Sequence, residues 1–183
     1  MLKPKKGRLL ISEPSMEDSN FFRSVILLAV HNKNESVGFV LNQPTKIKVH
    51  HLIENFPKSS FPIYIGGPVE KQSLHFIHTL GSIIPNSKQI IDGIYFGGDF
   101  DTVIQLMHDK KITKNEIRFF VGYSGWEAEQ LNNEIRDDAW IVQTAKNELC
   151  MNYSTPKLWS DIIKTKKMEH AIWANMPKDP SLN

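Results

Sequence analysis

A run of apolar, largely β-branched residues near the start of the chain constrains the fold most strongly. It reads VILLAV over residues 25–30, inside a segment at residues 21–31 that is typical of a strand buried on both faces. A polar connection at residues 32–35 follows, then a second strand-like segment at residues 36–42, and then Pro44. Because proline cannot donate to a ladder, the second strand should end there. The pattern predicts a β-hairpin.

The rest of the chain predicts short strands and few helices. Asp99 can cap a helix that runs through residues 102–107, and Pro156 suits the first turn of a final helix over about residues 155–167. A strand over residues 117–122 should break at residues 122–125, before a helix over about residues 127–136. Other strands are expected at residues 7–12, 63–65, 74–78, 93–96 and 140–143, with a short helix at residues 50–56. Hairpins without strict strand–helix alternation indicate one α+β domain over residues 1–183, with a mainly antiparallel sheet, three to four packed helices and a frayed tail at residues 176–183.

Composition narrows the class of protein without naming a reaction. The 183 residues include 22 Lys and Arg against 20 Asp and Glu, a formal net charge of +2. The single cysteine, Cys150, excludes an intrachain disulfide framework. The longest apolar run, residues 25–30, is far shorter than the about 20 residues of a spanning helix, and no export signal is recognised. We therefore expect a cytoplasmic protein that does not associate with membranes.

Three motifs suggest chemistry, and each has a more ordinary structural interpretation. The segment GYSGW at residues 122–126 resembles a nucleophile elbow, but Trp126 stands where that motif needs glycine, so a tight turn is favoured. The pairs Gly66-Gly67 and Gly97-Gly98 lack the further residues of a phosphate loop, and sharp turns are the expected role. Histidines 75 and 78 lie three apart in a predicted strand and should face opposite sides, so neither a metal site nor a cofactor is expected.

The polar residues before the buried strand are the strongest candidates for a site. Asp18 and Asn20 fall in a turn, Arg23 enters the strand, and His31 and Asn42 follow it. One interpretation is structural: Asp18 pairs with Arg23, and the Asn20 side chain closes the turn. The other makes Arg23 a binder of anions or carboxylates. The residues alone leave both interpretations open.

Taken together, these segments resemble the YqgE/AlgH family of bacterial proteins over about residues 7–145. The matching stretches are GxLLISxP at 7–14, DxxFxRSVILL at 18–28, His31, GFVLNxP at 38–44, YxGGPV at 64–69, His78, GYSGW at 122–126 and QLxxE at 130–134 with Trp140. Glu129 departs from the glycine usual in the family. The resemblance implies a coiled, partly bifurcated or barrel-like antiparallel sheet with helices against it. It assigns no reaction. One member has been called a transcriptional regulator, but this chain carries no helix-turn-helix signature.

The preferred functional prediction is a non-enzymatic binding or regulatory domain whose partner is a small molecule or a protein. Its candidate ligand-binding residues lie at strand ends and turns, where binding residues usually gather. They are Asp18, Asn20, Arg23, His31, Asn42, Gly66, Gly67, Trp126 and Gln130. An enzyme with His31 or His78 as base and Ser24 or Ser124 as nucleophile is the alternative. Nucleic-acid binding through the basic ends is disfavoured, because neither end carries a recognisable groove-reading motif. The oligomeric state stays open.

Overall fold

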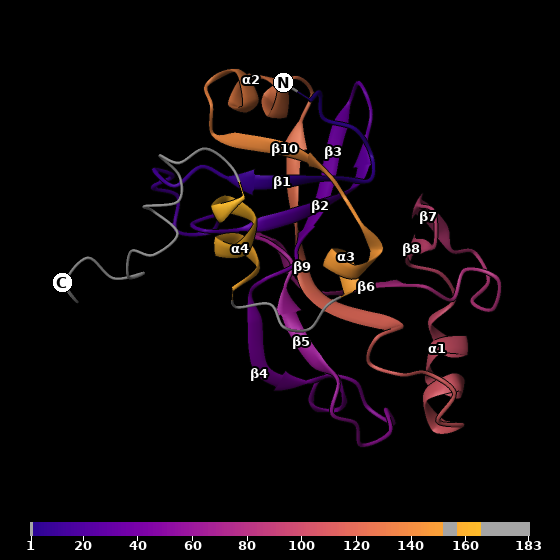
Figure 1. The fold of residues 1–183 in the computed structure, drawn as a ribbon. Coiled ribbons are helices and arrows are strands. Elements are labelled where there is room, and N and C mark those ends of the chain that lie inside the picture. Colours follow the sequence, from indigo (N-terminus) through magenta and orange to yellow (C-terminus); the bar gives the residue numbers. More distant parts are fainter. Residues whose placement is uncertain (1, 152–156, 166–183) are drawn as a thin grey trace.

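The computed structural model describes residues 2–151 and 157–165, and within them ten strands form one curled, half-barrel sheet (Figure 1). In chain order the strands are β1 (Arg8–Ser12), β2 (Val25–His31), β3 (Glu35–Val40), β4 (Pro44–Lys48), β5 (Pro62–Ile65), β6 (Val69–His78), β7 (Lys88–Ile91), β8 (Ile94–Phe96), β9 (Ile117–Glu127) and β10 (Trp140–Thr144). The helices are α1 (Phe100–His108), α2 (Gln130–Arg136), α3 (Asn147–Met151) and α4 (Leu158–Lys164), with a 3₁₀ turn η1 (Val49–His51). The predicted α+β fold class is confirmed.

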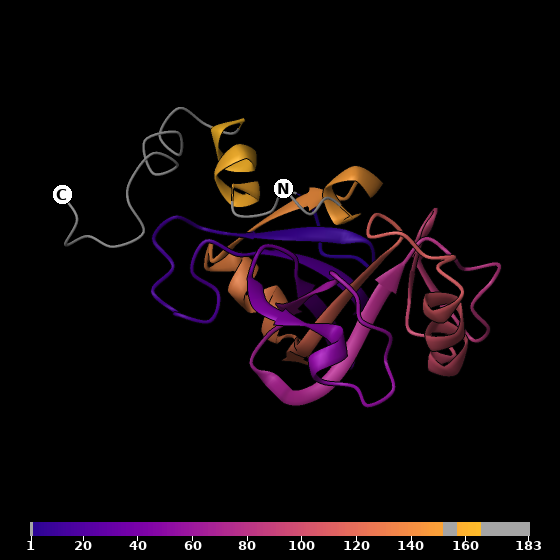
Figure 2. The same ribbon diagram turned by 90° about the horizontal axis from the view of Figure 1, so that it is seen from below.

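The predicted hairpin forms, and its burial on both faces has a clear cause. β2 pairs antiparallel with β3, Leu27 opposite Phe39, and with β1 on its other side. Alternate side chains enter two different cores: Leu27 packs with α3 and α4, whereas Ile26 packs with α2. Helices therefore cover both faces of this part of the sheet (Figure 2). A continuous apolar run is what such a doubly covered strand requires.

The long strand β9 exchanges one neighbour for another partway along. Residues 117–121 lie between β5, which is parallel, and β6, which is antiparallel, and residues 124–127 pair with β3. Gly66 stands at this fork: its N–H donates to the Val121 carbonyl at 2.8 Å, and its own carbonyl accepts from Val40 N at 2.9 Å. The sheet therefore divides into two branches at the point where β5 ends and β3 takes its place.

Glycines make the fork possible. Gly122 has φ +66°, and a Cβ there would lie 2.7 Å from the carbonyl oxygens of both Gly67 and Val69. A Cβ on Gly66 or Gly67 would likewise overlap the backbone of β9. The predicted break of the strand at residues 122–125 is therefore wrong. Gly122 bends the strand, but β9 continues to Glu127 because β3 supplies a new partner for it.

Three of the predicted helices are found with small shifts, whereas the segment predicted as a helix over residues 50–56 forms only the 3₁₀ turn η1. The Asp99 carboxylate accepts from Thr102 N at 2.8 Å and caps α1, as predicted. α2 begins at Gln130 and not at residue 127, because β9 runs on to Glu127. Of the helix predicted over 155–167, Leu158–Lys164 is confirmed; residues 155–156 and 166–167 and the tail 176–183 lie outside the described residues. Strands β4 and β7 and helix α3 were not predicted.

A buried arginine, which the sequence did not single out, ties distant segments together. Arg118 on β9 is fully buried; its guanidinium donates to the Cys150 carbonyl at 2.7 Å and to the Leu41 carbonyl at 2.5 Å. Its charge also lies 4.2 Å from the centre of the Tyr64 ring. These contacts hold α3 and the end of β3 against β9. No helix in residues 2–151 and 157–165 is long and apolar enough to span a bilayer.

Candidate ligand-binding site

A hydrogen bond from backbone to side chain closes the turn before β2. The structural interpretation expected the Asn20 side chain to close this turn, but the acceptor is the Asp18 carboxylate. Asp18 Oδ1 accepts from the Asn20 backbone N at 2.8 Å and from Asn20 Nδ2 at 3.0 Å. Arg23 adopts a positive φ of 52° at the end of the turn. Its guanidinium lies 5.2 Å from the centre of the Trp159 ring, and burial lowers its pKa. The Arg23 guanidinium therefore makes cation–π contacts with aromatic rings.

Asn42 fastens this turn to the end of β3. Its side chain accepts from Val25 N at 2.9 Å and donates to the Arg23 carbonyl at 2.8 Å. The adjacent Gln43 continues the connection, because its Nε2 donates to the Asn20 carbonyl at 3.2 Å and to Ser24 Oγ at 3.1 Å. Both amide side chains therefore hold the turn in one position against the sheet.

A cavity of about 460 Å³ lies between this turn and the fork of the sheet. Asn20 and Gln43 line one side, and Gly67 lines it from the turn after β5. Among the described residues that line it, Lys71 is the only charged one, and none is a histidine, cysteine, aspartate or glutamate. The remaining wall is Ser19 and Thr45 with the apolar residues Ile47, Ile65, Pro68 and Val121. This volume lies in the range of small-molecule sites.

Trp126 and Gln130 line a different hollow, of about 500 Å³, together with Tyr123. Trp126 is only 3% exposed, and its indole N–H donates to Glu134 Oε2 at 2.8 Å. The Trp140 indole donates to the same oxygen at 2.8 Å, and Gln130 Nε2 donates to Glu134 Oε1 at 2.9 Å. Trp126 of the GYSGW motif and Gln130 and Glu134 of the QLxxE motif therefore form, with Trp140, a structural network between β9, α2 and β10.

Five of the nine predicted candidates divide among three hollows, whereas Asp18, Arg23, Asn42 and Gly66 line none of these three. Asn20 shares one cavity with Gly67, directly beside Asn42 and Gly66, whereas Trp126 shares another with Gln130. His31 lines a third, beside Glu129. Phe21, the residue after Asn20 in the turn, stacks its ring on Trp126 with a centroid distance of 6.0 Å.

The serine and histidine side chains of the enzyme alternative have other hydrogen-bond partners. His31 Nδ1 lies 2.8 Å from Ser36 Oγ, and His78 Nε2 lies 2.8 Å from the Gly97 carbonyl and 3.2 Å from Ser87 Oγ. Ser124 is fully buried and donates to the Gly66 carbonyl at 3.1 Å. In the part of the chain that the structure describes, no three His, Cys, Asp or Glu side chains are grouped to hold a metal ion.

Two residues of the first cavity, Gln43 and Lys71, were not among the predicted candidates. Gln43 stands next to Asn42 and before Pro44, so its position at a strand end could have indicated it. Lys71 carries no comparable signal, because it is one exposed lysine in a strand that faces this cavity only after folding.

Fold and cavity together define an α+β protein with a forked half-barrel sheet and a small pocket at the fork. Comparison with known proteins gives the family: the chain belongs to the AlgH-like family (DUF179), whose sequence profile matches residues 9–171. A UPF0301 protein of Chlorobium limicola is 39% identical over 181 residues, covering 99% of this chain and 97% of that protein. A UPF0301 protein of Bacteroides fragilis is 36% identical, covering 98% and 92%.

Solved structures show the same fold. The crystal structure of protein DIP2367 from Corynebacterium diphtheriae superposes with a TM-score of 0.77 at 24% identity, covering 96% of this chain and 94% of that one. The solution structure of the AlgH protein from Pseudomonas aeruginosa gives a TM-score of 0.73 at 23% identity, covering 98% and 100%. The resemblance inferred from the sequence motifs is confirmed.

Proposed function

We propose that this protein is a non-enzymatic cytosolic binding or regulatory protein, and that it takes up a small carboxylic acid with an apolar body at the fork cavity. The observation that carries the proposal is the lining itself. Lys71 supplies one positive charge, Asn20 and Gln43 supply amides, and the remaining wall is largely apolar. A ligand with a charged head and a hydrocarbon tail complements this arrangement.

The rigidity of the walls supports binding at this place. Gln43 and Asn42 are both hydrogen-bonded to the turn that forms one side of the cavity, and the backbone of the opposite side is packed tightly at Gly67. A preformed site loses little conformational entropy when a ligand enters. Asp18 stands near the cavity, but its Oδ1 already accepts two hydrogen bonds from Asn20.

Binding is favoured over catalysis by the kinds of side chain present. The commonest general bases are imidazole and carboxylate groups, and a serine or threonine hydroxyl becomes an active nucleophile when such a base lies beside it. The described residues that line the fork cavity supply hydroxyl, amide and ammonium groups, and no imidazole, carboxylate or thiol. Such groups orient and hold a ligand without a proton transfer of their own.

Hexanoate and its neutral analogue hexanamide test the proposal. We expect hexanoate to bind more tightly, and Lys71→Met to weaken hexanoate by about fivefold while leaving hexanamide unchanged, because a partly exposed charge pair contributes up to ~1 kcal/mol. Lys114→Met, which removes an exposed lysine outside the cavity lining, is the matched control and should bind hexanoate like the wild type. Equal affinities for the two probes, or equal losses in both variants, would contradict the proposed site.

A further inference from the structure

Four neighbouring segments of the sheet each contribute one residue to a row across the fork cavity. The carbonyl of Gln43, just before β4, accepts from Ile65 N at 2.9 Å, and Ile65 on β5 lies opposite Val121 on β9. Lys71 lies on β6, the other neighbour of β9, with its Cα 3.4 Å from a Cβ built on Gly122. All four residues of the row line the cavity. The row therefore runs from an amide, over two apolar side chains, to an ammonium group.

The two polar ends of this row are well separated. Neighbouring strands lie about 4.8 Å apart, so the three steps from Gln43 to Lys71 separate their backbones by about 14 Å along the sheet. Ile65 and Val121 lie between them. An acid whose carboxylate pairs with Lys71 therefore lays its hydrocarbon body over these two side chains and directs its other end toward Gln43.

The side-chain amide of Gln43 has its nitrogen bonded to the wall and its oxygen left over. Nε2 donates to the Asn20 carbonyl at 3.2 Å and to Ser24 Oγ at 3.1 Å, which uses both of its N–H groups. A backbone carbonyl only accepts, so the nitrogen and not the oxygen must face Asn20. Oε1 has no hydrogen-bond partner among the described residues and is not one of their buried unpartnered atoms, so it is open to a ligand.

The neighbouring polar side chains leave the same kind of atom free. Thr45 Oγ1 donates to the Ile63 carbonyl at 2.9 Å, so its hydroxyl hydrogen is already used. Asn20 Nδ2 donates to Asp18, and the Asn20 side-chain oxygen has no partner among the described residues. This end of the cavity thus offers amide oxygens, and the described lining residues include no carboxylate. Such oxygens suit a neutral donor, because an ammonium ion would lose water there without an opposite charge in the lining.

We propose that the acid bound at the fork cavity carries a hydroxyl group at the end of its chain opposite the carboxylate, and that Gln43 selects it by accepting from this hydroxyl. The inference rests on the proposed function, because it needs the carboxylate to pair with Lys71. It adds the class of ligand, an ω-hydroxy acid, and the residue that determines specificity. A terminal methyl group in the same place would cover the Gln43 oxygen without satisfying it, which lowers affinity.

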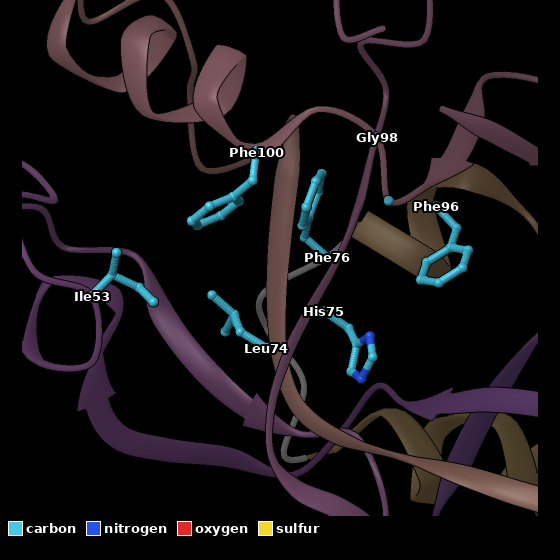
Figure 3. A pocket seen from close by; sticks show the side chains of 8 residues that line it. Ile53, Leu74, His75, Phe76, Phe96, Gly98 and Phe100 are labelled. Atoms are coloured by element: carbon cyan, nitrogen blue, oxygen red, sulfur yellow. The ribbon is translucent and has the colours of Figure 1, made fainter. Parts of the chain in front are cut away.

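A second hollow, of about 450 Å³, lies beside β6 and is mainly aromatic (Figure 3). Phe76 and Phe100 lie next to each other with their ring centres 5.8 Å apart, and His75 points to the other side of β6 (Figure 3). None of the described residues that line this hollow is a lysine or an arginine, and burial lowers the pKa of His75. The hollow offers no cation to a carboxylate at pH 7. Acids should therefore leave the amide of Gly97, which lines it, unshifted.

Three acids test the inference by titration of the ¹⁵N-labelled protein. They are 6-hydroxyhexanoate, heptanoate, which has a methyl group in place of that hydroxyl, and 2-hydroxyheptanoate, which carries its hydroxyl beside the carboxylate. We expect saturable shifts of the Gly67 amide with all three. The affinity for 6-hydroxyhexanoate should be about fivefold higher than for the other two, the value of one added hydrogen bond. The Gly97 amide should stay in place.

Gln43→Met keeps the length of the side chain and removes its oxygen, while Asn42 still fastens the turn. It should remove the preference by weakening 6-hydroxyhexanoate alone. If Gln43 only supported the wall, this change would weaken all three acids alike. Gln89→Met is the matched control, because Gln89 is exposed and lies outside the cavity lining, and it should keep the preference.

The outcomes separate this inference from the proposed function. Saturable binding of all three acids with equal affinity overturns the role of Gln43 and leaves the carboxylate site standing, whereas no saturable binding of any acid overturns both. A preference that survives in Gln43→Met, or a gain of the same size for 2-hydroxyheptanoate, also overturns the inference. Should Gln43→Met fail to fold, the comparison of the three acids in the wild type decides.

Discussion

Replacing Glu134 with alanine should destabilise the protein, because this carboxylate is the acceptor for two buried indole N–H groups. The carboxylate accepts two indole N–H groups at 2.8 Å, from Trp126, which is 3% exposed, and from Trp140, which is 1% exposed. A buried donor that loses its acceptor costs roughly 1–3 kcal/mol. Two such donors predict a loss of about 2–6 kcal/mol, and we expect about 3 kcal/mol because water can enter beside the half-buried Glu134.

Equilibrium unfolding in urea, followed by far-ultraviolet circular dichroism, measures this loss without depending on tryptophan fluorescence. Glu134→Gln keeps one carbonyl acceptor and should lose about half as much, roughly 1.5 kcal/mol. Glu54→Ala is the control, because Glu54 is exposed and should change stability by less than about 0.5 kcal/mol. A folded Glu134→Ala protein with a change as small as the control would refute the reasoning that the indoles depend on this carboxylate.

Three further predictions concern the fork and the buried titratable groups. Gly122→Ala should lower the free energy of unfolding by more than about 2 kcal/mol in the same urea assay, because φ is +66° and the nearest carbonyl oxygens lie 2.7 Å from the new Cβ. Gly125→Ala is the control and should lower it by less than about 1 kcal/mol, because the nearest atom to its new Cβ lies at 3.3 Å. Burial lowers the pKa of both His75 and His78, so below about pH 6.5 the unfolded chain binds more protons than the folded one. The free energy of unfolding should therefore fall as the pH drops through that range. A free energy of unfolding that stays constant from pH 7 to 5 would contradict this. Burial raises the pKa of the Cys150 thiol to about 12, so a disulfide reagent at pH 8 should react with Cys150 only after unfolding, and reaction at the rate of a free thiol would argue against its burial.

The elements that could be predicted are those whose cause is local. The apolar run at residues 25–30 predicts a strand buried on both faces, because all of its side chains are apolar. The cap of α1 depends only on Asp99 and on the backbone N–H of Thr102, three residues later. The continuation of β9 past Gly122 could not be read locally, because it depends on β3, whose paired residues lie almost ninety positions earlier. β4 was missed because its exposed sequence, PTKIK, shows little apolar alternation.

The site was only partly predictable for the same reason. Asn20 and Gly67 were chosen as turn residues, and they share a cavity because the fork brings their turns together. Lys71 joins them only through the pairing of β6 with β9, and nothing in its own surroundings in the sequence indicates that. Arg118 was missed because its acceptors are backbone carbonyls of Leu41 and Cys150, which no side-chain pattern reveals.

The central claim, that the cavity at the fork of the sheet is a binding site for a small carboxylate, is tested most directly by titrating hexanoate into the ¹⁵N-labelled protein. We expect the Gly67 and Val121 amides to shift together along one saturation curve, while the Gly97 amide, which lies outside this cavity, stays in place. The absence of saturable shifts at Gly67 and Val121, or saturable shifts at Gly97 alone, would contradict it.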